Sequence, residues 1–187
     1  MCLYWEMMTT HFELKTRYGS VYWTAFPVEN HLNRIFAELS SASGMAISRA
    51  DMKRTPEGRP EFPDCGFDAN WTHSKDVCVL AYSFQAKVGV DIEKLRPRAL
   101  RIAERFFAKD EIALLLHSGL SPEDSLRQFY RIWCRKEALF KCSGGSFLGK
   151  ILSQSVLLDN VGETFFYDIN LPVENPFAAT IAVAPNR

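Results

Sequence analysis

Hydrophobic patterns typical of strands and of helices fall in mostly separate parts of this chain, which limits the folds open to it. Alternating apolar and polar residues predict a strand over 20–25. Runs rich in β-branched and aromatic residues predict strands over 77–84 and 88–93, and the short polar link 85–87 is typical of a hairpin. A helix is predicted over 29–40. This segregated order indicates an α+β chain.

The second part of the chain is expected to be mainly helical before strands close it. Its best-supported element is a long helix that ends near residue 142. Ser121, Pro122 and Asp124 give this helix an N-cap, a proline at the first helical position and an acid in the first turn. The other predicted elements are helices over 97–107 and 110–117, the second with Asp110 as N-cap, and strands over 156–158, 164–168 and 180–184.

Charge and cysteine content exclude several classes of protein. The chain carries 22 basic and 22 acidic side chains, so it lacks the overall cationic field of a dedicated nucleic-acid or anionic-membrane binder. Its five cysteines are scattered without a CxxC pair, which indicates neither a disulfide framework nor a zinc site.

The sequence has no pattern of a signal peptide or a membrane helix. No cation precedes Lys15, unlike in a signal peptide, and no uncharged stretch reaches the ~20 apolar residues of a membrane helix. We therefore expect a cytoplasmic protein.

A segment rich in proline and glycine follows the first predicted helix. The stretch 53–66, KRTPEGRPEFPDCG, holds three prolines and two glycines, so it is expected to be a connecting loop and the hinge between two halves. Arg59 lies in this loop, where a lone arginine would ordinarily be a surface charge.

One charged residue interrupts the apolar stripe of the long predicted helix. The stripe consists of Leu126, Phe129, Tyr130 and Trp133. Carried forward at 100° per residue, the helical wheel places Glu137 about 20° from Leu126, near the middle of this face. A carboxylate removed from water is costly unless it is paired or binds a metal. Glu137 is therefore a functional candidate, and the alternative is an ordinary i,i+4 pair with Lys141.

Two carboxylates end the strand predicted over 88–93. Asp91 and Glu93 are two residues apart, so they share one face of the strand while Ile92 points to the other. Acids at a strand end are usually just solvated. A third carboxylate from a helix packed on that strand would instead complete a hard oxygen site that suits Mg²⁺.

The segment WTHSKD supplies a further candidate, His73. Its neighbours Thr72, Ser74 and Lys75 are hydrogen-bond donors that could surround a phosphate. The alternative is a histidine with a purely structural role.

The segment GGSFLGKI has the spacing of a phosphate-binding loop as far as Lys150. Ile151 replaces the hydroxyl residue that would hold Mg²⁺, and the segment is predicted to follow a helix and precede a strand, the reverse of the required order. The glycines more simply end the long helix. A nucleotide hydrolase built on this loop is kept only as an alternative.

Taken together and in this order, the segments GRPEFP, WTHSKD, VGVDIEK, RFFAKDE and WCRKEALFK resemble the 4′-phosphopantetheinyl transferases. The resemblance is to the larger monomeric, surfactin-synthetase-activating type, and it covers roughly residues 58–141. It implies transfer of the phosphopantetheine arm of coenzyme A to a serine of an apo carrier protein, with release of 3′,5′-phosphoadenosine.

The resemblance also implies a metal site and catalytic residues. Asp91, Glu93 and Glu137 would be the Mg²⁺ ligands. Glu137, Lys141 and Asp91 would form the catalytic set, with Glu137 the candidate base for the proton of the attacking serine. Glu111 matches a further active-site acid of the family.

Coenzyme A is the implied co-substrate, and the family's contacts to it can be carried over in part. His73 with Thr72 would hold its 3′-phosphate. Lys136 and Lys141 match phosphate-binding lysines, and Arg59 matches a basic residue that contacts the coenzyme.

The implied fold consists of two similar α+β halves with pseudo-twofold symmetry, here 1–87 and 88–187, in a monomer. The implied partner is an acyl, peptidyl or polyketide carrier protein, without nucleic acid or membrane. Threonine replaces the usual serine at position 72, and Lys75 stands where glycine is common. The alternative function is a non-catalytic module that binds coenzyme A or a carrier protein.

Overall fold

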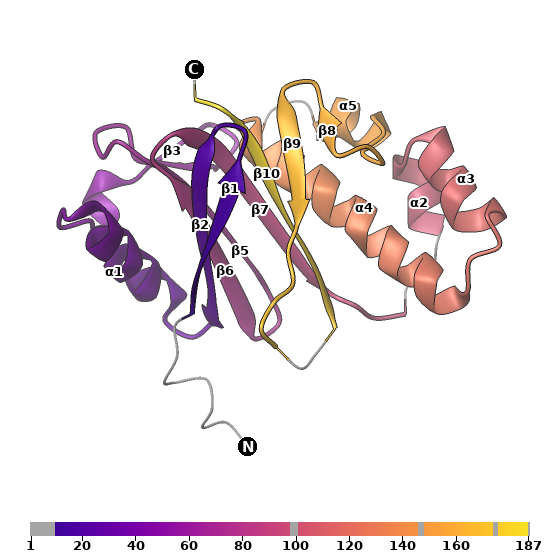
Figure 1. Ribbon diagram of the computed structural model, residues 1–187, viewed down its shortest axis with the longest axis horizontal. Helices are drawn as coiled ribbons and strands as arrows, with labels where there is room; N and C mark the ends of the chain where they lie inside the picture. Colours follow the sequence, from indigo (N-terminus) through magenta and orange to yellow (C-terminus); the bar gives the residue numbers. More distant parts are fainter. Residues whose placement is uncertain (1–9, 98–100, 146–147, 174–175, 187) are drawn as a thin grey trace.

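The computed structural model describes residues 10–97, 101–145, 148–173 and 176–186, and the described strands form two four-stranded antiparallel sheets and a short two-stranded ribbon (Figure 1). The order in the first sheet is β1 (His11–Thr16), β2 (Gly19–Pro27), β6 (Val77–Ser83) and β5 (Asp68–Ser74). The order in the second is β7 (Ala86–Lys94), β10 (Phe177–Pro185), β9 (Thr164–Asp168) and β8 (Asn160–Val161). The chain is therefore α+β, as its sequence predicts.

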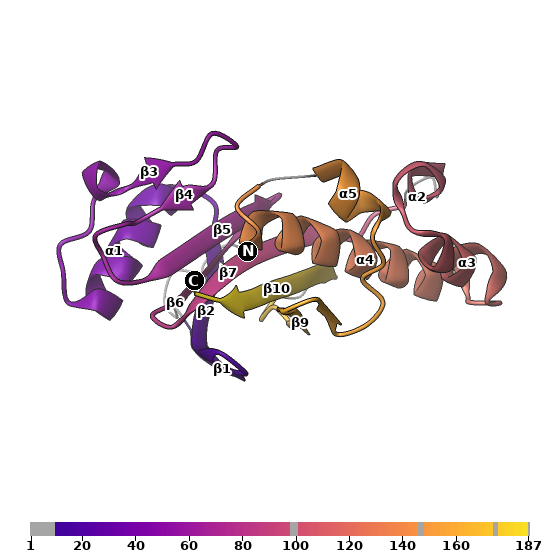
Figure 2. The ribbon, with the colours of Figure 1, turned by 90° about the horizontal axis from the view of Figure 1, so that it is seen from above.

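Helices flank the strands on opposite sides. α1 (His31–Ser43) buries Ile35 and Leu39 in a cluster with residues of β5 and β6. The helices of the second part of the chain are α2 (Arg101–Phe106), α3 (Lys109–His117), α4 (Pro122–Cys142) and α5 (Leu148–Ser153). Figures 1 and 2 show α1 at one side of the strands and α2–α5 at the other.

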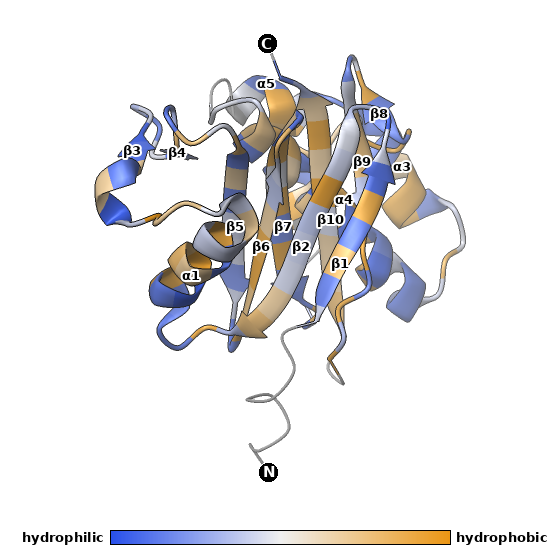
Figure 3. Cartoon of the chain, turned by 60° about the vertical axis from the view of Figure 1, so that its left-hand side comes forward, coloured by the Kyte–Doolittle hydropathy of each residue, from blue (hydrophilic) through white to orange (hydrophobic). Residues whose placement is uncertain are grey.

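The faces of the sheets that are turned away from the helices share one apolar core. Alternate residues of β7, Val88, Val90 and Ile92, are buried in this core together with valines, alanines and isoleucine from β6 and β10. β1 lies at the edge of the first sheet, and exposed and partly buried residues alternate along it. Figure 3 shows hydrophilic and hydrophobic residues alternating along the same strand. This period of two is what a strand with one covered face requires.

The long helix α4 forms where its local signals place it. The hydroxyl of Ser121 accepts a hydrogen bond from the backbone N–H of Asp124 at 3.1 Å, and Pro122 is the first helical residue. Phe129 and Tyr130 are fully buried, while Leu126 and Trp133 pack against the same cluster. The predicted N-cap and apolar stripe are both confirmed.

A seam of polar side chains joins the two sheets along β5 and β7. Three side-chain oxygens of β5 accept backbone N–H groups of β7, each exactly 20 residues further on: Asp68 from Val88, Asn70 from Val90 and Ser74 from Lys94. The constant offset means that the two strands run in the same direction. Side-chain oxygens here take the place that backbone carbonyls hold in an ordinary ladder.

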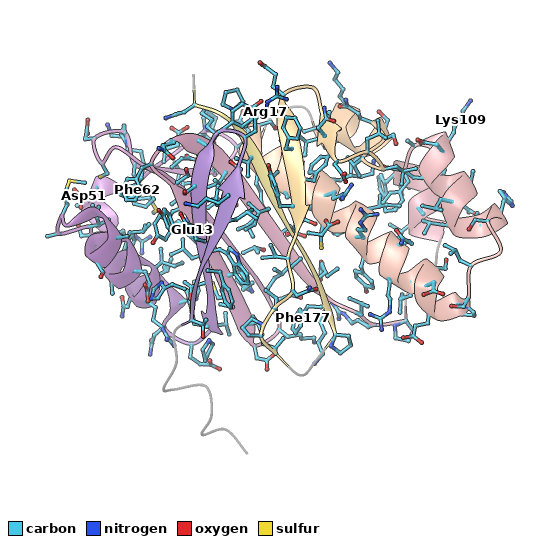
Figure 4. All side chains as sticks on the ribbon, in the orientation of Figure 1. Glu13, Arg17, Asp51, Phe62, Lys109 and Phe177 are labelled. Carbon is cyan, nitrogen blue, oxygen red and sulfur yellow. The ribbon has the colours of Figure 1, made fainter. Side chains whose placement is uncertain are left out.

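The sheets also touch at the tips of their hairpins. The hydroxyl of Tyr18 donates to the carbonyl of Glu163 at 2.9 Å. Arg17, labelled in Figure 4, places its guanidinium carbon 5.3 Å from the ring centre of Phe165. Residues from the two parts of the chain thus meet at two separate places.

Several predicted boundaries differ from the structure. The segment 53–66 connects α1 to β5 by way of the ribbon of β3 (Lys53–Arg54) and β4 (Pro60–Glu61), so it lies within the first part of the chain and is not a hinge between halves. Residues 156–158 form no strand, because the backbone carbonyls there turn to Arg135. Asp110 is not an N-cap, since α3 already begins at Lys109. The link 85–87 does not close the predicted hairpin, because β6 and β7 belong to different sheets. The strands β1, β3, β4, β5 and β8 and the helix α5 are not among the predicted elements.

Candidate active site

Two carboxylates of β7 point toward α4. Asp91 is buried and Glu93 half-buried, whereas Ile92 between them lies in the core on the other face of the strand. The alternation that the sequence implies therefore holds, and both acids share one face.

Gly89 lets α4 lie directly on that face. A Cβ atom at Gly89 would lie 2.2 Å from the carbonyl oxygen of Ala138 and 2.4 Å from the backbone nitrogen of Cys142. Any side chain would push the helix away from the strand. Because Glu137 precedes Ala138, this close contact brings a third carboxylate toward those of β7.

The electrostatics of Glu137 show that these acids influence one another. Burial raises the pKa of Glu137, the negative charge of Asp91 raises it further, and the cation of Lys141 opposes the shift. Glu93 adds a smaller upward contribution. Residues from β7 and α4, distant in sequence, thus form one electrostatic cluster.

Lys141 pairs with β7 rather than along its own helix. Its Nζ lies 2.7 Å from Oδ1 of Asp91 and also donates to the carbonyl of Val90 at 3.1 Å and the hydroxyl of Thr72 at 3.2 Å. The ordinary i,i+4 pair of Glu137 with Lys141 is therefore not the arrangement that forms.

The donor atoms of this cluster fit a divalent cation. Oδ2 of Asp91 is buried and has no hydrogen-bond partner among the described residues. Carboxylate oxygens are the ligands that Mg²⁺ prefers, and a cation would relieve the repulsion between the acids. Within the same described residues, no three His, Cys, Asp or Glu side chains lie in positions that could hold a metal as they stand. Binding would therefore require side-chain rotation.

Thr72 and His73, which were predicted to hold one phosphate together, point to opposite faces of β5. Thr72 is buried, and its hydroxyl lies 3.4 Å from Oδ1 of Asp91. His73 is exposed, with its ring centre 5.7 Å from that of His31 on α1. Alternation along the strand separates them.

The guanidinium of Arg59 is bound by other groups of the protein. Its side chain is 4% exposed and pairs with Asp68. The guanidinium also donates to the carbonyl of Lys141 at 2.8 Å and to that of Val88 at 3.1 Å. This side chain holds its loop against the end of α4 and β7, and its predicted contact with the coenzyme stays a prediction.

Lys136, a predicted phosphate contact, lies in a buried ion pair. Its side chain is fully buried, and Nζ lies 2.8 Å from Oε2 of Glu111, which is fully buried as well. The same nitrogen donates to the carbonyls of Leu152 and Gln154 at 2.8 and 2.6 Å. Burial lowers the pKa of Lys136 although Glu111 opposes this. The pair holds α3 and the segment after α5 against α4.

A pocket of about 240 Å³ adjoins Lys141, and the sequence did not reveal it. Its residues come from the loop 54–60, from β5 and from the end of α4: Arg54, Glu57, Gly58, Arg59, Pro60, Asn70, Trp71, Phe140, Lys141 and Gly145. Two aromatic and three cationic residues in one pocket suit a ligand with a flat ring and phosphate groups. Trp71 was within the quoted segment WTHSKD, but only the fold places it in the same pocket as Phe140.

The described elements around the glycine-rich segment 144–151 do not fit a nucleotide-binding loop. The segment follows α4, and Lys150 lies in the short helix α5, so a helix precedes the segment where the loop requires a strand.

None of the helices in the described ranges has the length and apolar character needed to cross a membrane.

Comparisons with known proteins show the family of this chain. A sequence profile of the 4′-phosphopantetheinyl transferase superfamily matches residues 87–180. The 4′-phosphopantetheinyl transferase AcpT of Escherichia coli K12 is 40% identical over 93 residues, which cover 48% of this chain and 47% of AcpT. Sfp of Bacillus subtilis is 35% identical over 113 residues, 60% of this chain and 47% of Sfp. The 4′-phosphopantetheinyl transferase ffp of Bacillus subtilis is 32% identical over 144 residues, 74% of this chain and 62% of ffp.

The chain thus spans about half the length of AcpT and of Sfp. The profile match runs from the start of β7 into β10, so it contains all three acids of the cluster and Lys141.

Proposed function

The chain belongs to the 4′-phosphopantetheinyl transferase superfamily, and on this premise we propose that it transfers the 4′-phosphopantetheine arm of coenzyme A to a serine hydroxyl of an apo carrier protein. The other product is 3′,5′-phosphoadenosine. The bond that breaks joins the phosphopantetheine phosphorus to the bridging oxygen of the diphosphate, and the bond that forms joins this phosphorus to the serine oxygen.

One observation carries the proposal: Lys141 of α4 pairs with Asp91 of β7 at the place where Glu137 is also brought in. The reaction builds negative charge on phosphate oxygens, so fixed cations and a metal site next to one another are what it needs. A chain that only bound coenzyme A would not need three carboxylates that influence one another electrostatically.

Asp91, Glu93 and Glu137 are the proposed ligands of a Mg²⁺ ion. When bound, such an ion neutralises charge on the diphosphate and polarises its oxygens. Oδ2 of Asp91 is the oxygen best prepared for this role, because it is buried and Lys141 binds the other oxygen, Oδ1.

Lys141 and Glu137 are proposed to act on the reacting groups themselves. The ammonium of Lys141 would attract a phosphate oxygen of coenzyme A. Because burial and neighbouring carboxylates raise the pKa of Glu137, its carboxylate is more basic than an exposed one and suits the removal of the serine proton. The serine itself belongs to the carrier protein.

The pocket beside Lys141 is the proposed coenzyme site. Trp71 and Phe140 offer flat apolar surfaces, and Arg54 adds a cation. His73 lies two residues after Trp71 on the same face of β5, so His73 alone, without Thr72, remains the candidate for the 3′-phosphate.

The proposed partner is an acyl, peptidyl or polyketide carrier protein, with the chain acting as a monomer in the cytoplasm. The test is mass spectrometry of several apo carrier proteins incubated with the chain, coenzyme A and Mg²⁺. Transfer adds the phosphopantetheine arm, about 340 Da. A module that only binds coenzyme A or a carrier would add no mass to any of them.

A further inference from the structure

Ser74 on β5 contacts one of the proposed metal ligands across the seam between the sheets. We propose that Ser74 is a positioning residue that orients the Glu93 carboxylate for a divalent cation. The inference rests on the proposed function, because it concerns the same metal site.

The hydroxyl of Ser74 is itself held in place. It accepts a hydrogen bond from the backbone N–H of Lys94 at 3.2 Å and lies 3.2 Å from Oε2 of Glu93. A hydroxyl has a single hydrogen, so with Lys94 donating to its lone pair the hydrogen is free to point at Glu93. Ser74 is 8% exposed, so water competes little for this contact.

Glu93 needs such a restraint more than Asp91 does. Its side chain has one more rotatable bond, is half-buried, and lies in the cluster whose negative charges act on Glu137. Repulsion from Asp91 and Glu137 favours rotation of Glu93 toward solvent. The hydrogen bond from Ser74 opposes this rotation, so less ordering remains to be done when a cation binds.

The strands repeat this arrangement at an interval of two residues. Thr72 lies beside Asp91 as Ser74 lies beside Glu93, so one hydroxyl of β5 faces each carboxylate of β7. Lys141 also holds Asp91, at 2.7 Å. Among the described residues no lysine or arginine pairs with Glu93, which leaves the Ser74 hydroxyl as its protein donor.

The experiment measures Mn²⁺ binding by electron paramagnetic resonance, on the full chain without coenzyme or carrier. Wild type is compared with Ser74→Ala, which removes the hydroxyl, and with Ser74→Thr, which keeps it. The control is Ser83→Ala, because Ser83 is a buried serine of β6 whose hydroxyl donates to the carbonyl of Ser20, away from the acids. Thermal unfolding of each variant shows that it is folded.

Loss of an outer contact to a metal ligand typically weakens metal affinity about 10–100-fold, and we expect at least a tenfold rise in the Mn²⁺ dissociation constant for Ser74→Ala. The Mg²⁺ concentration for half-maximal transfer should rise by a similar factor. Ser74→Thr and Ser83→Ala should stay within about threefold of wild type.

Two results would overturn the role of Ser74 while leaving the proposed function intact: Mn²⁺ affinity unchanged in Ser74→Ala, or equal weakening in Ser74→Ala and Ser74→Thr. In both cases the wild type still modifies a carrier protein. A wild type that neither binds Mn²⁺ nor modifies any carrier would instead remove the proposed function, and the role of Ser74 with it.

Discussion

Nζ of Lys141 lies 2.7 Å from Oδ1 of Asp91, while Oδ2 of the same carboxylate is buried without a hydrogen-bond partner among the described residues. One oxygen of Asp91 is thus satisfied by a protein cation and the other is left for a second cation.

Replacing Lys141 by methionine should separate the effect of the lysine cation on Asp91 from the effect of a bound metal ion. Without the ammonium, the buried Asp91 carboxylate loses its cation, which should destabilise the metal-free chain by about 1–3 kcal/mol. Added Mg²⁺ should then raise the melting temperature more than it does for wild type, because it no longer competes with the ammonium. Transfer should fall about 100-fold with the loss of a charge-stabilising donor.

Lys150→Met is the matched control for Lys141→Met, since Lys150 is an exposed lysine of α5. It should change neither transfer nor unfolding. Loss of activity in the control would contradict the site described here and favour the glycine-rich segment.

Glu137→Gln should abolish transfer while leaving the metal-free chain at least as stable as wild type. Burial and the charge of Asp91 raise the pKa of Glu137, so the folded state favours its neutral form. That stabilisation is fully present below the unfolded pKa of about 4.3 and is lost as the pH rises through the higher folded pKa. Relative to the variant, wild type should therefore lose stability between about pH 4.3 and neutrality.

Urea unfolding in the presence of a chelator, at several pH values, measures this difference for Glu137→Gln. A variant that is less stable than wild type at neutral pH, or that keeps near-full transfer, would contradict the role assigned to Glu137.

Gly89→Ala should damage both stability and transfer, because the new Cβ would meet backbone atoms that cannot move aside cheaply. Overpacking of this kind typically costs about 1–3 kcal/mol. Gly149→Ala is the control, since nothing lies within 4 Å of a Cβ there. Calorimetry and the carrier assay would show whether the shift of α4 affects both properties; an unaffected Gly89→Ala would mean that the close approach is unimportant.

Lys136→Met should destabilise the chain strongly without any specific loss of coenzyme affinity. Removing one partner of a buried ion pair leaves an uncompensated charge on Glu111, which typically costs about 3–5 kcal/mol. The double variant Lys136→Met, Glu111→Leu should regain much of that stability because it removes both charges. Denaturant unfolding measures the stability, and the coenzyme concentration for half-maximal transfer tests the binding. A folded Lys136→Met chain with greatly weakened coenzyme binding would restore the direct phosphate role.

Local patterns identified much of the site in advance. The apolar stripe of α4 marked Glu137 as a charge on a buried face, and the spacing of two placed Asp91 and Glu93 on one side of a strand. Both follow from the fixed periods of helix and strand, which depend on neighbouring residues alone. The alternation of side chains along a strand also separates Thr72 from His73. This rule can be applied only where a strand is predicted, and the sequence pattern did not predict β5.

Rules of this kind do not predict which residues distant in the chain form ion pairs or hydrogen bonds with one another. Arg59 and Lys136 were predicted to contact the coenzyme, yet Arg59 bonds to residues of β7 and α4, and Lys136 to Glu111 of α3. Lys75 has a φ of 58° in the turn between β5 and β6, a left-handed conformation that favours glycine, so its departure from the family pattern concerns a turn. No local pattern shows which cationic side chains are buried and paired with other groups of the protein.

The sequence by itself determined the class of fold, the long capped helix and the three acids, because periodicity and capping act over a few residues. Only the tertiary structure decided which cation pairs with the acids of the site and which cations pair with other groups that hold the helices together. The physical reason is that a buried charge takes the nearest opposite charge in space, and that neighbour is set by the packing of α4 on β7 and not by its distance along the chain.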